Sequence, residues 1–175
     1  MVDQMNAPRR LFFALWPNAA SRRELVSRQE ALGLAGRKTA AANLHITLAF
    51  IGNADLAYCD CLRQAAATVT AEPFELTLNQ LGYFSKPRVV WVGPSQVPVG
   101  LEILRAKLLS AIAGCGYTSR DDAFTPHVTL ARKAPPVAPQ SFSPITWKVD
   151  EFALVESCST AGGVRYESLE SYRLV

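Results

Sequence analysis

Both histidines of the chain lie in the same short pattern, which makes them the first candidates for chemistry. The chain has two histidines among its 175 residues. The first opens the run His45-Ile-Thr-Leu-Ala, and the second opens the run His127-Val-Thr-Leu-Ala. Histidine gives or takes a proton near neutral pH. Two imidazoles aimed at one spot would therefore supply a general acid and a general base.

A threonine follows each histidine by two positions. Residues i and i+2 of a strand point to the same face, so Thr47 would lie beside His45 and Thr129 beside His127. A threonine hydroxyl can donate and accept hydrogen bonds on a stiff stem, which suits it to hold a phosphoryl oxygen. Opposed imidazoles suit in-line displacement at phosphorus, because the attacking and leaving oxygens lie on opposite sides. We therefore expect a phosphate site that uses no metal and no other cofactor.

Arg132 is the candidate cation for the non-bridging phosphate oxygens, which a guanidinium can bind in pairs. Strict alternation places Arg132 on the strand face opposite to His127. It reaches the site only if the strand ends, twists or bulges after Ala131. Phe50 occupies the matching place in the first motif and meets the same obstacle. The alternative for Arg132 is a solvated surface arginine.

Further residues that could bind substrate lie in and around a predicted hairpin. Tyr83, Phe84 and Trp91 could stack on a nucleobase, although aromatic residues in strands more often pack in the core. Arg88 could steer phosphates or be a solvated charge at the end of a strand.

Strands and helices that would position these residues are interleaved along the chain. Hydrophobic periodicity predicts helices over 18–32, 55–70 and 99–115, and strands over 10–16, 44–51, 74–81, 88–93, 127–133, 145–158 and 164–174, with a short strand or loop over 37–42. We expect 74–81 and 88–93 to form a hairpin across Gly82 to Pro87. Frequent hairpins indicate a mostly antiparallel sheet and the α+β class.

The two motif strands predict an internal pseudo-repeat, since they lie 82 residues apart in a chain about twice as long. We expect two pseudo-symmetric lobes with helices on their outer faces and a central cleft to which each lobe contributes one motif. Residues 1–175 would form one such bilobal domain, with residues 1–8 as a flexible tail.

Composition places limits on the partners. The net charge is +3, and residues 1–45 hold seven basic and three acidic side chains, a balance of +4. This bias suits a phosphate-bearing partner, although solubility alone would also explain it, and it lacks the basic stripe of a dedicated nucleic-acid binder. No run approaches the roughly 18 apolar residues of a membrane span, and residues 1–10 do not resemble a secretory signal. We expect a cytoplasmic monomer that binds no membrane.

The four cysteines do not have the spacing of a metal site. Cys59 and Cys61 are separated by one residue, and no Cys-x-x-Cys pair accompanies them. With Cys115 and Cys158, we expect reduced and mostly buried thiols.

The two motifs resemble the signature of the two-histidine phosphoesterase superfamily. The closer similarity is to its bacterial and archaeal RNA 2′,3′-cyclic phosphodiesterases, also called 2′-5′ RNA ligases. Four segments carry it in order: Arg10-Leu-Phe-Phe-Ala-Leu-Trp-Pro17, Asn43-Leu-His-Ile-Thr-Leu-Ala-Phe-Ile-Gly52, Arg88-Val-Val-Trp-Val-Gly93 and Pro126-His-Val-Thr-Leu-Ala-Arg132. The similarity extends from about residue 9 to the C-terminus.

The resemblance implies metal-independent hydrolysis of an RNA 2′,3′-cyclic phosphate to a 2′-phosphate end. It implies that His45 gives a proton to the departing 3′ oxygen, that His127 activates water, and that Thr47 and Thr129 hold the phosphate. The reverse chemistry would join RNA ends through a 2′-5′ bond. One alternative is action on another 2′-linked phosphodiester, such as 2′-5′ oligoadenylate, or on a small cyclic nucleotide. The other is a module that binds RNA ends without turnover, although such a module needs no acid–base pair.

Overall fold

The structure is a computed structural model that describes residues 7–119 and 123–175, so most of the expected flexible tail over residues 1–8 lies outside it. Its elements, in chain order, are β1 (Arg9–Leu15), α1 (Ala19–Ala31), β2 (Arg37–Lys38), the 3₁₀ turn η2 (Ala41–Asn43), β3 (Ile46–Ala54), α2 (Leu56–Ala67), β4 (Phe74–Leu78), β5 (Gln80–Phe84), β6 (Val89–Gly93), α3 (Val99–Ala113), β7 (Val128–Arg132), β8 (Ile145–Val149), β9 (Glu151–Thr160) and β10 (Gly163–Arg173). Within the two described ranges no helix is long and apolar enough to cross a membrane.

One eight-stranded sheet runs through the molecule in the order β10-β9-β1-β3-β7-β6-β5, with β2 beside β7, and β4 and β8 form a second, two-stranded sheet. The strand pairs of both sheets are antiparallel, which confirms the predicted α+β class. The motif strands β3 and β7 are joined at one residue pair, Ile46 with Val128. The large sheet therefore has two halves that touch at a single point, between the two motifs.

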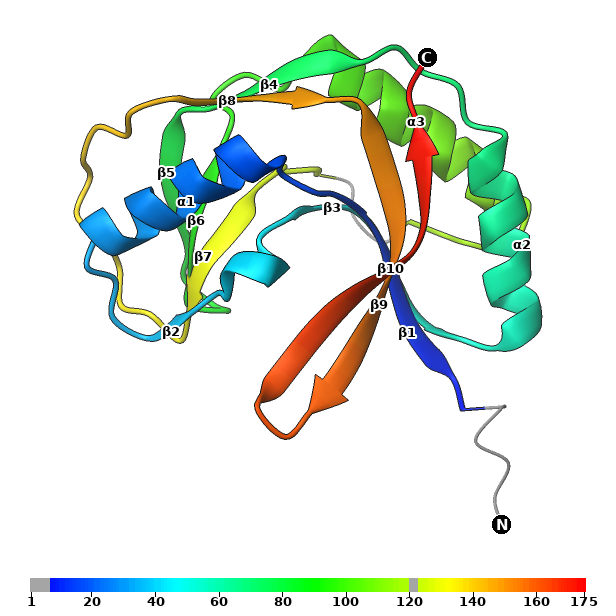
Figure 1. The fold of residues 1–175 in the computed structure, drawn as a ribbon, viewed down its shortest axis with the longest axis horizontal. Helices are drawn as coiled ribbons and strands as arrows, with labels where there is room; N and C mark the ends of the chain where they lie inside the picture. Colours follow the sequence, from blue (N-terminus) through cyan, green and yellow to red (C-terminus); the bar gives the residue numbers. More distant parts are fainter. Residues whose placement is uncertain (1–6, 120–122) are drawn as a thin grey trace.

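Helices are divided between the two halves of the sheet. Figure 1 shows α2 and α3 beside the half that holds β1, β9 and β10, and α1 beside the half that holds β5, β6 and β7. β1 is buried on both of its faces from Leu11 to Leu15, as a central strand must be. Leu11, Phe13 and Leu15 enter the main core, whereas Phe12 and Ala14 enter a small cluster on the other face. The second face of β1 thus forms part of the floor of the region around the first motif.

Two strands predicted as continuous are each divided between the two sheets. The run over 74–81 breaks at Asn79, so β4 pairs with β8 and only β5 forms the hairpin with β6. At the break, Oδ1 of Asn79 accepts from the N–H of Ser95 at 2.8 Å, and Nδ2 of Asn79 donates to the Ser95 hydroxyl at 2.9 Å. The run over 145–158 breaks at Asp150, whose carbonyl accepts from the N–H of Leu174 at 2.8 Å. Apolar residues continue past both breaks, so the hydrophobic pattern predicted one strand in each case.

The prediction of reduced thiols was wrong for two of the four cysteines. Cys61 on α2 and Cys115, two residues beyond α3, form a disulfide with a Cα–Cα distance of 5.8 Å. Of the described cysteines, Cys59 is buried and free, and Cys158 is half-buried and free. The pairing arises because α2 and α3 pack side by side, a contact that the spacing of the cysteines in the sequence does not indicate.

We expect the double substitution Cys61→Ser and Cys115→Ser to lower the free energy of unfolding. The bond joins residues 54 positions apart, so its loss returns about 4 kcal/mol of loop-closure entropy to the unfolded chain. Urea unfolding of both proteins measures the change, with Cys158→Ser as the control. An unchanged urea midpoint in the double variant would contradict a bond between these thiols.

Candidate active site

The register between β3 and β7 brings the two motifs together. Because Ile46 pairs with Val128 in an antiparallel ladder, the same register places His45 opposite Thr129 and Thr47 opposite His127. Each histidine therefore faces the threonine of the other motif. The strands separate beyond this one pair, which leaves space for a ligand on either side of the contact.

Two pockets flank the contact. The His45 pocket has a volume of about 220 Å³. It is lined by His45, Thr129, Arg132, Tyr166, Arg37 and Lys38, together with Thr39, Ala40, Asn43 and residues 162–164 of the β9–β10 hairpin. The His127 pocket, of about 990 Å³, is lined by His127 and Thr47 and extends along β3 toward α2 and α3, past Phe50, Phe84, Arg105 and Phe124. Each pocket holds the histidine of one motif and the threonine of the other, so the motifs share one cleft.

Both imidazoles are held in the same tautomer. Nδ1 of His45 lies 2.7 Å from the carbonyl oxygen of Asn43, and Nδ1 of His127 lies 2.7 Å from that of Thr125. A carbonyl oxygen only accepts, so Nδ1 carries the proton in each ring and Nε2 is the basic atom. Nε2 of His45 also lies 3.1 Å from Oγ1 of Thr47. In each ring Nε2 is therefore the atom that can exchange a proton with a ligand.

Aromatic rings enclose both imidazoles in matching ways. The edge of Tyr166 meets His45 at 5.1 Å between centroids, and the edge of Phe84 meets His127 at 5.0 Å. Phe12 and Trp16 complete the wall around His45, at 5.0 and 5.5 Å. These contacts fix the ring planes and withdraw the imidazoles from water.

Burial lowers the pKa of both histidines. The pKa of His45 falls from 6.5 to about 4, first because burial penalises the charged ring and then because His127 and Arg132 add positive charge, while the bond to Asn43 opposes the change. Burial also lowers the pKa of His127, and Arg132 adds to the effect. An anion held between the rings would reverse this balance, because an opposite charge favours the protonated form.

A β-bulge brings Arg132 to the cleft. Along β7, Ala131 pairs with Val90 and Thr129 with Trp91, so Leu130 is an extra residue. Leu130 and Ala131 both enter the core, and Arg132 returns to the face of Thr129. Arg132 was expected to reach the cleft only through an irregularity after Ala131. The bulge that brings it there lies at Leu130, one position earlier.

The first motif strand, β3, contains a β-bulge at the matching position. Ala49 pairs with Phe13 and Thr47 with Ala14, so Leu48 is the extra residue of β3. Phe50 thereby turns into the His127 pocket, where its side chain is 52% exposed. The guanidinium of Arg10 lies 5.1 Å from the centre of the Phe50 ring. Phe50 thus lines the cleft at the position that corresponds to Arg132.

Polar side chains from two helices satisfy the carbonyls of the bulges. Nε of Arg105 on α3 donates to the oxygen of Leu48 at 3.0 Å. Nε2 of Gln29 on α1 donates to the oxygen of Leu130 at 2.7 Å, beside the N–H of Thr39, which donates to the same oxygen at 2.9 Å; Gln29 is only 5% exposed. A buried backbone carbonyl needs such a partner. Neither role can be predicted from the sequence, because on a helix each residue resembles an ordinary polar position.

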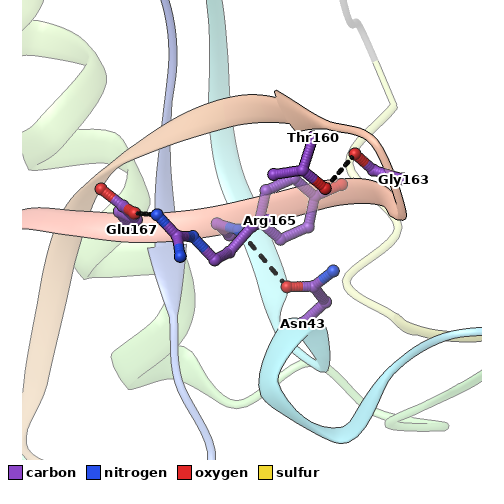
Figure 2. A network of polar contacts seen from close by, with 6 residues as sticks. Asn43, Thr160, Gly163, Arg165 and Glu167 are labelled. Atoms are coloured by element: carbon purple, nitrogen blue, oxygen red, sulfur yellow. Dashed lines mark hydrogen bonds and ion pairs between the residues drawn. The ribbon is translucent and has the colours of Figure 1, made fainter.

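Asn43 positions His45 from the other side, a role that the sequence pattern does not indicate either. Its Nδ2 donates to the carbonyl of Val164 at 2.8 Å, and its Oδ1 accepts from the N–H of Tyr166 at 3.4 Å. Figure 2 shows Asn43 reaching the β9–β10 hairpin, where Oγ1 of Thr160 donates to Gly163 across the turn and Arg165 pairs with Glu167. The carbonyl that holds Nδ1 of His45 is therefore tied to β10.

The three aromatic residues that could stack on a nucleobase, Phe84, Trp91 and Tyr83, lie in different surroundings. Phe84 lines the His127 pocket beside the imidazole. Trp91 is 8% exposed and lies beneath Gly82, where an added Cβ would come within 2.1 Å of the indole. The hydroxyl of Tyr83 donates to the carbonyl of Ala134 at 2.9 Å. Arg88 lies at the turn with a φ of 55°, and its carbonyl accepts from Ala134.

The antiparallel α+β fold, with paired His-x-Thr motifs at one cleft, has a match among protein families. The model of the 2′-5′ RNA ligase superfamily matches residues 16–159, and the chain belongs to this family. The resemblance drawn from the motifs is thereby confirmed.

Individual relatives agree with the family. The RNA 2′,3′-cyclic phosphodiesterase of Escherichia coli K12 is 35% identical over 175 residues, which cover 97% of this chain and 99% of that protein. The protein of the same name from Archaeoglobus fulgidus is 30% identical over 82% of this chain and 88% of its own. The crystal structure of E. coli LigT complexed with 3′-AMP superposes with a TM-score of 0.89 at 35% identity, over 96% of this chain and 99% of that one.

We expect the pKa of His45 to be well below 6.5 in the protein alone and to rise when inorganic phosphate is added. Burial and the neighbouring positive charges disfavour the imidazolium, and a bound anion offsets both. Titration of the ring protons by NMR, with and without phosphate, measures the shift. A pKa near 6.5 that does not respond to phosphate would contradict the site.

Proposed function

We propose that this protein hydrolyses RNA 2′,3′-cyclic phosphate ends to 2′-phosphomonoesters by acid–base catalysis with two histidines. The observation that carries the proposal is the interleaving of the motifs, in which each pocket holds one imidazole and the threonine of the other motif. The E. coli and A. fulgidus relatives are RNA 2′,3′-cyclic phosphodiesterases by name, which supports hydrolysis of the same cyclic phosphate.

The proposed reaction has one proton transfer at each imidazole. Nε2 of His127 takes a proton from water as the water oxygen bonds to phosphorus. The bond from phosphorus to the 3′ oxygen breaks in line, and His45 gives its Nε2 proton to that oxygen. The bond to the 2′ oxygen remains, so the product carries a 2′-phosphate. The anionic substrate favours the imidazolium of His45 that this step needs.

Thr47, Thr129 and Arg132 would hold the phosphate. The threonine hydroxyls lie on the cleft face beside the imidazoles, and Arg132 adds a positive charge near both rings. Donors aimed at the non-bridging oxygens stabilise the charge that develops on them. The same groups would join RNA ends when a 5′-hydroxyl takes the place of water: the 5′ oxygen bonds to phosphorus, the 3′ oxygen leaves, and the product is a 2′-5′ phosphodiester.

We further propose that one chain suffices for activity, as a single bilobal domain over residues 1–175 acting in the cytoplasm. The cleft is built from both halves of one sheet, so a second subunit need contribute no residue to it. Small cyclic nucleotides would share the reacting group with RNA ends and would serve as substrates as well.

Two alternatives make different predictions. A relative acting on 2′-5′ oligoadenylate or another 2′-linked phosphodiester would cleave those compounds and leave 2′,3′-cyclic ends intact. A module that binds RNA ends without turnover would retain affinity in His45→Ala and His127→Ala and would show no catalysis. The aligned tautomers of the two rings favour an acid–base pair over such a module.

We expect an oligonucleotide with a 2′,3′-cyclic end to be converted to a product that keeps its phosphate on the 2′ oxygen. His45→Ala or His127→Ala alone should lower the rate by a factor of about 10²–10⁴, because each removes one proton transfer. Identification of the phosphorylated hydroxyl and single-turnover rates measure both expectations, with Cys158→Ser as the control. Retention of the phosphate on the 3′ oxygen would contradict the assignment.

We also expect excess EDTA to leave the rate of hydrolysis unchanged. The proposed acid, base and phosphate-binding groups all come from side chains, so no step uses a metal ion. Rates before and after prolonged dialysis against EDTA test this. A large loss that an added divalent cation restores would overturn the metal-independent reaction.

A further inference from the structure

The positive charge of the cleft is concentrated in the His45 pocket. Arg37, Lys38 and Arg132 line this pocket, and no aspartate or glutamate lines it. The ion pairs found within the described residues involve other arginines, so these three cations have no acidic partner there. In the His127 pocket, by contrast, Arg105 is engaged with the carbonyl of Leu48 and lies 4.2 Å from the centre of the Phe124 ring. The two sides of the cleft therefore differ in free charge.

Arg37 forms the rim of the His45 pocket. β2 pairs with β7 so that Arg37 lies opposite Arg132, which places both side chains on one face. Gly36 permits this close approach, since a Cβ there would lie 2.6 Å from the carbonyl oxygen of Arg132. The guanidinium extends to the β9–β10 hairpin, where its Nη2 lies 3.0 Å from the position of a Cβ at Gly163. Arg37 thus bridges the two halves of the sheet at the mouth of the pocket.

The direction of the proposed reaction places the RNA on this side. His45 gives its proton to the 3′ oxygen, and water attacks from the side of His127. The 2′ and 3′ oxygens belong to one ribose, so the terminal nucleoside must lie beside His45. The chain then leaves the cleft past the rim of the His45 pocket, and water enters from the wider His127 pocket.

We infer that Arg37 binds the phosphodiester that joins the last nucleotide of the RNA to the one before it. A guanidinium can hold two oxygens of such a phosphate, and Arg37 is exposed and carries no competing acid. Arg132 serves the reacting phosphate, whereas Arg37 serves the next phosphate along the chain. The site thereby selects RNA chains over mononucleotides. This inference rests on the proposed function and names its substrate class.

The test compares two substrates in each protein. One is a dinucleotide with a 2′,3′-cyclic end, and the other is the corresponding mononucleoside 2′,3′-cyclic phosphate, which lacks the second phosphate. We expect kcat/KM of the wild type to be higher for the dinucleotide. Arg37→Gln should lower the ratio of the two kcat/KM values by about tenfold, since it removes a charged hydrogen bond to the second phosphate. Arg37→Lys should keep part of the ratio because it retains the charge.

Arg23→Gln is the matched control, because Arg23 is an exposed arginine of α1 that lines neither pocket. It should leave the ratio unchanged. Turnover of the mononucleotide by Arg37→Gln also reports whether that variant is folded. A ratio that Arg37→Gln leaves unchanged, or an equal loss on both substrates, would overturn the role of Arg37. A wild type that turns over neither substrate would instead reject the proposed function.

Discussion

Each motif strand has an extra residue directly after its threonine, Leu48 in β3 and Leu130 in β7, and the cleft depends on these two bulges. Without the bulge, a strand could present histidine and threonine to the cleft, but the side chain three positions after the threonine would point into the core. The bulge sends two consecutive apolar residues inward and returns the following residue to the cleft. Side chains of two helices bond the carbonyls of these residues: Arg105 of α3 donates to Leu48, and Gln29 of α1 donates to Leu130, which also accepts from the N–H of Thr39. The helices therefore hold the site as well as cover the sheet.

Both halves of the large sheet contain a β-bulge in the motif strand, but the side chains around the two bulges differ. Tyr166 and Phe84 stand at equivalent edges of the imidazoles, and Asn43 and Thr125 supply equivalent carbonyls. The residue that each bulge returns to the cleft breaks the symmetry, with a phenyl ring on one side and a guanidinium on the other. Under the proposed function, the difference between a guanidinium and a phenyl ring would give an asymmetric substrate its direction in the cleft.

The alternation of side chains along a strand was enough to predict which motif residues share one face of the sheet. The pairing of His45 with Thr47 and of His127 with Thr129 on one face needs only a period of two. The bulges could not be predicted this way, because an extra apolar residue leaves the composition of the strand unchanged. Arg37 lies in a two-residue strand, which is too short to show any period. The Cys61–Cys115 bond and the division of two long strands between sheets depend on contacts between distant segments, which a single sequence does not display.

The shared anchoring of both rings through Nδ1 has a consequence for successive turnovers. Under the proposed reaction, one cycle moves a proton from the Nε2 of His45 and leaves one on the Nε2 of His127. Because neither ring changes its tautomer or turns over, the starting state returns by exchange of single protons with solvent at atoms that already face the cleft. Recovery between cycles therefore requires no rearrangement of the protein, and solvent access to the two rings would set its speed.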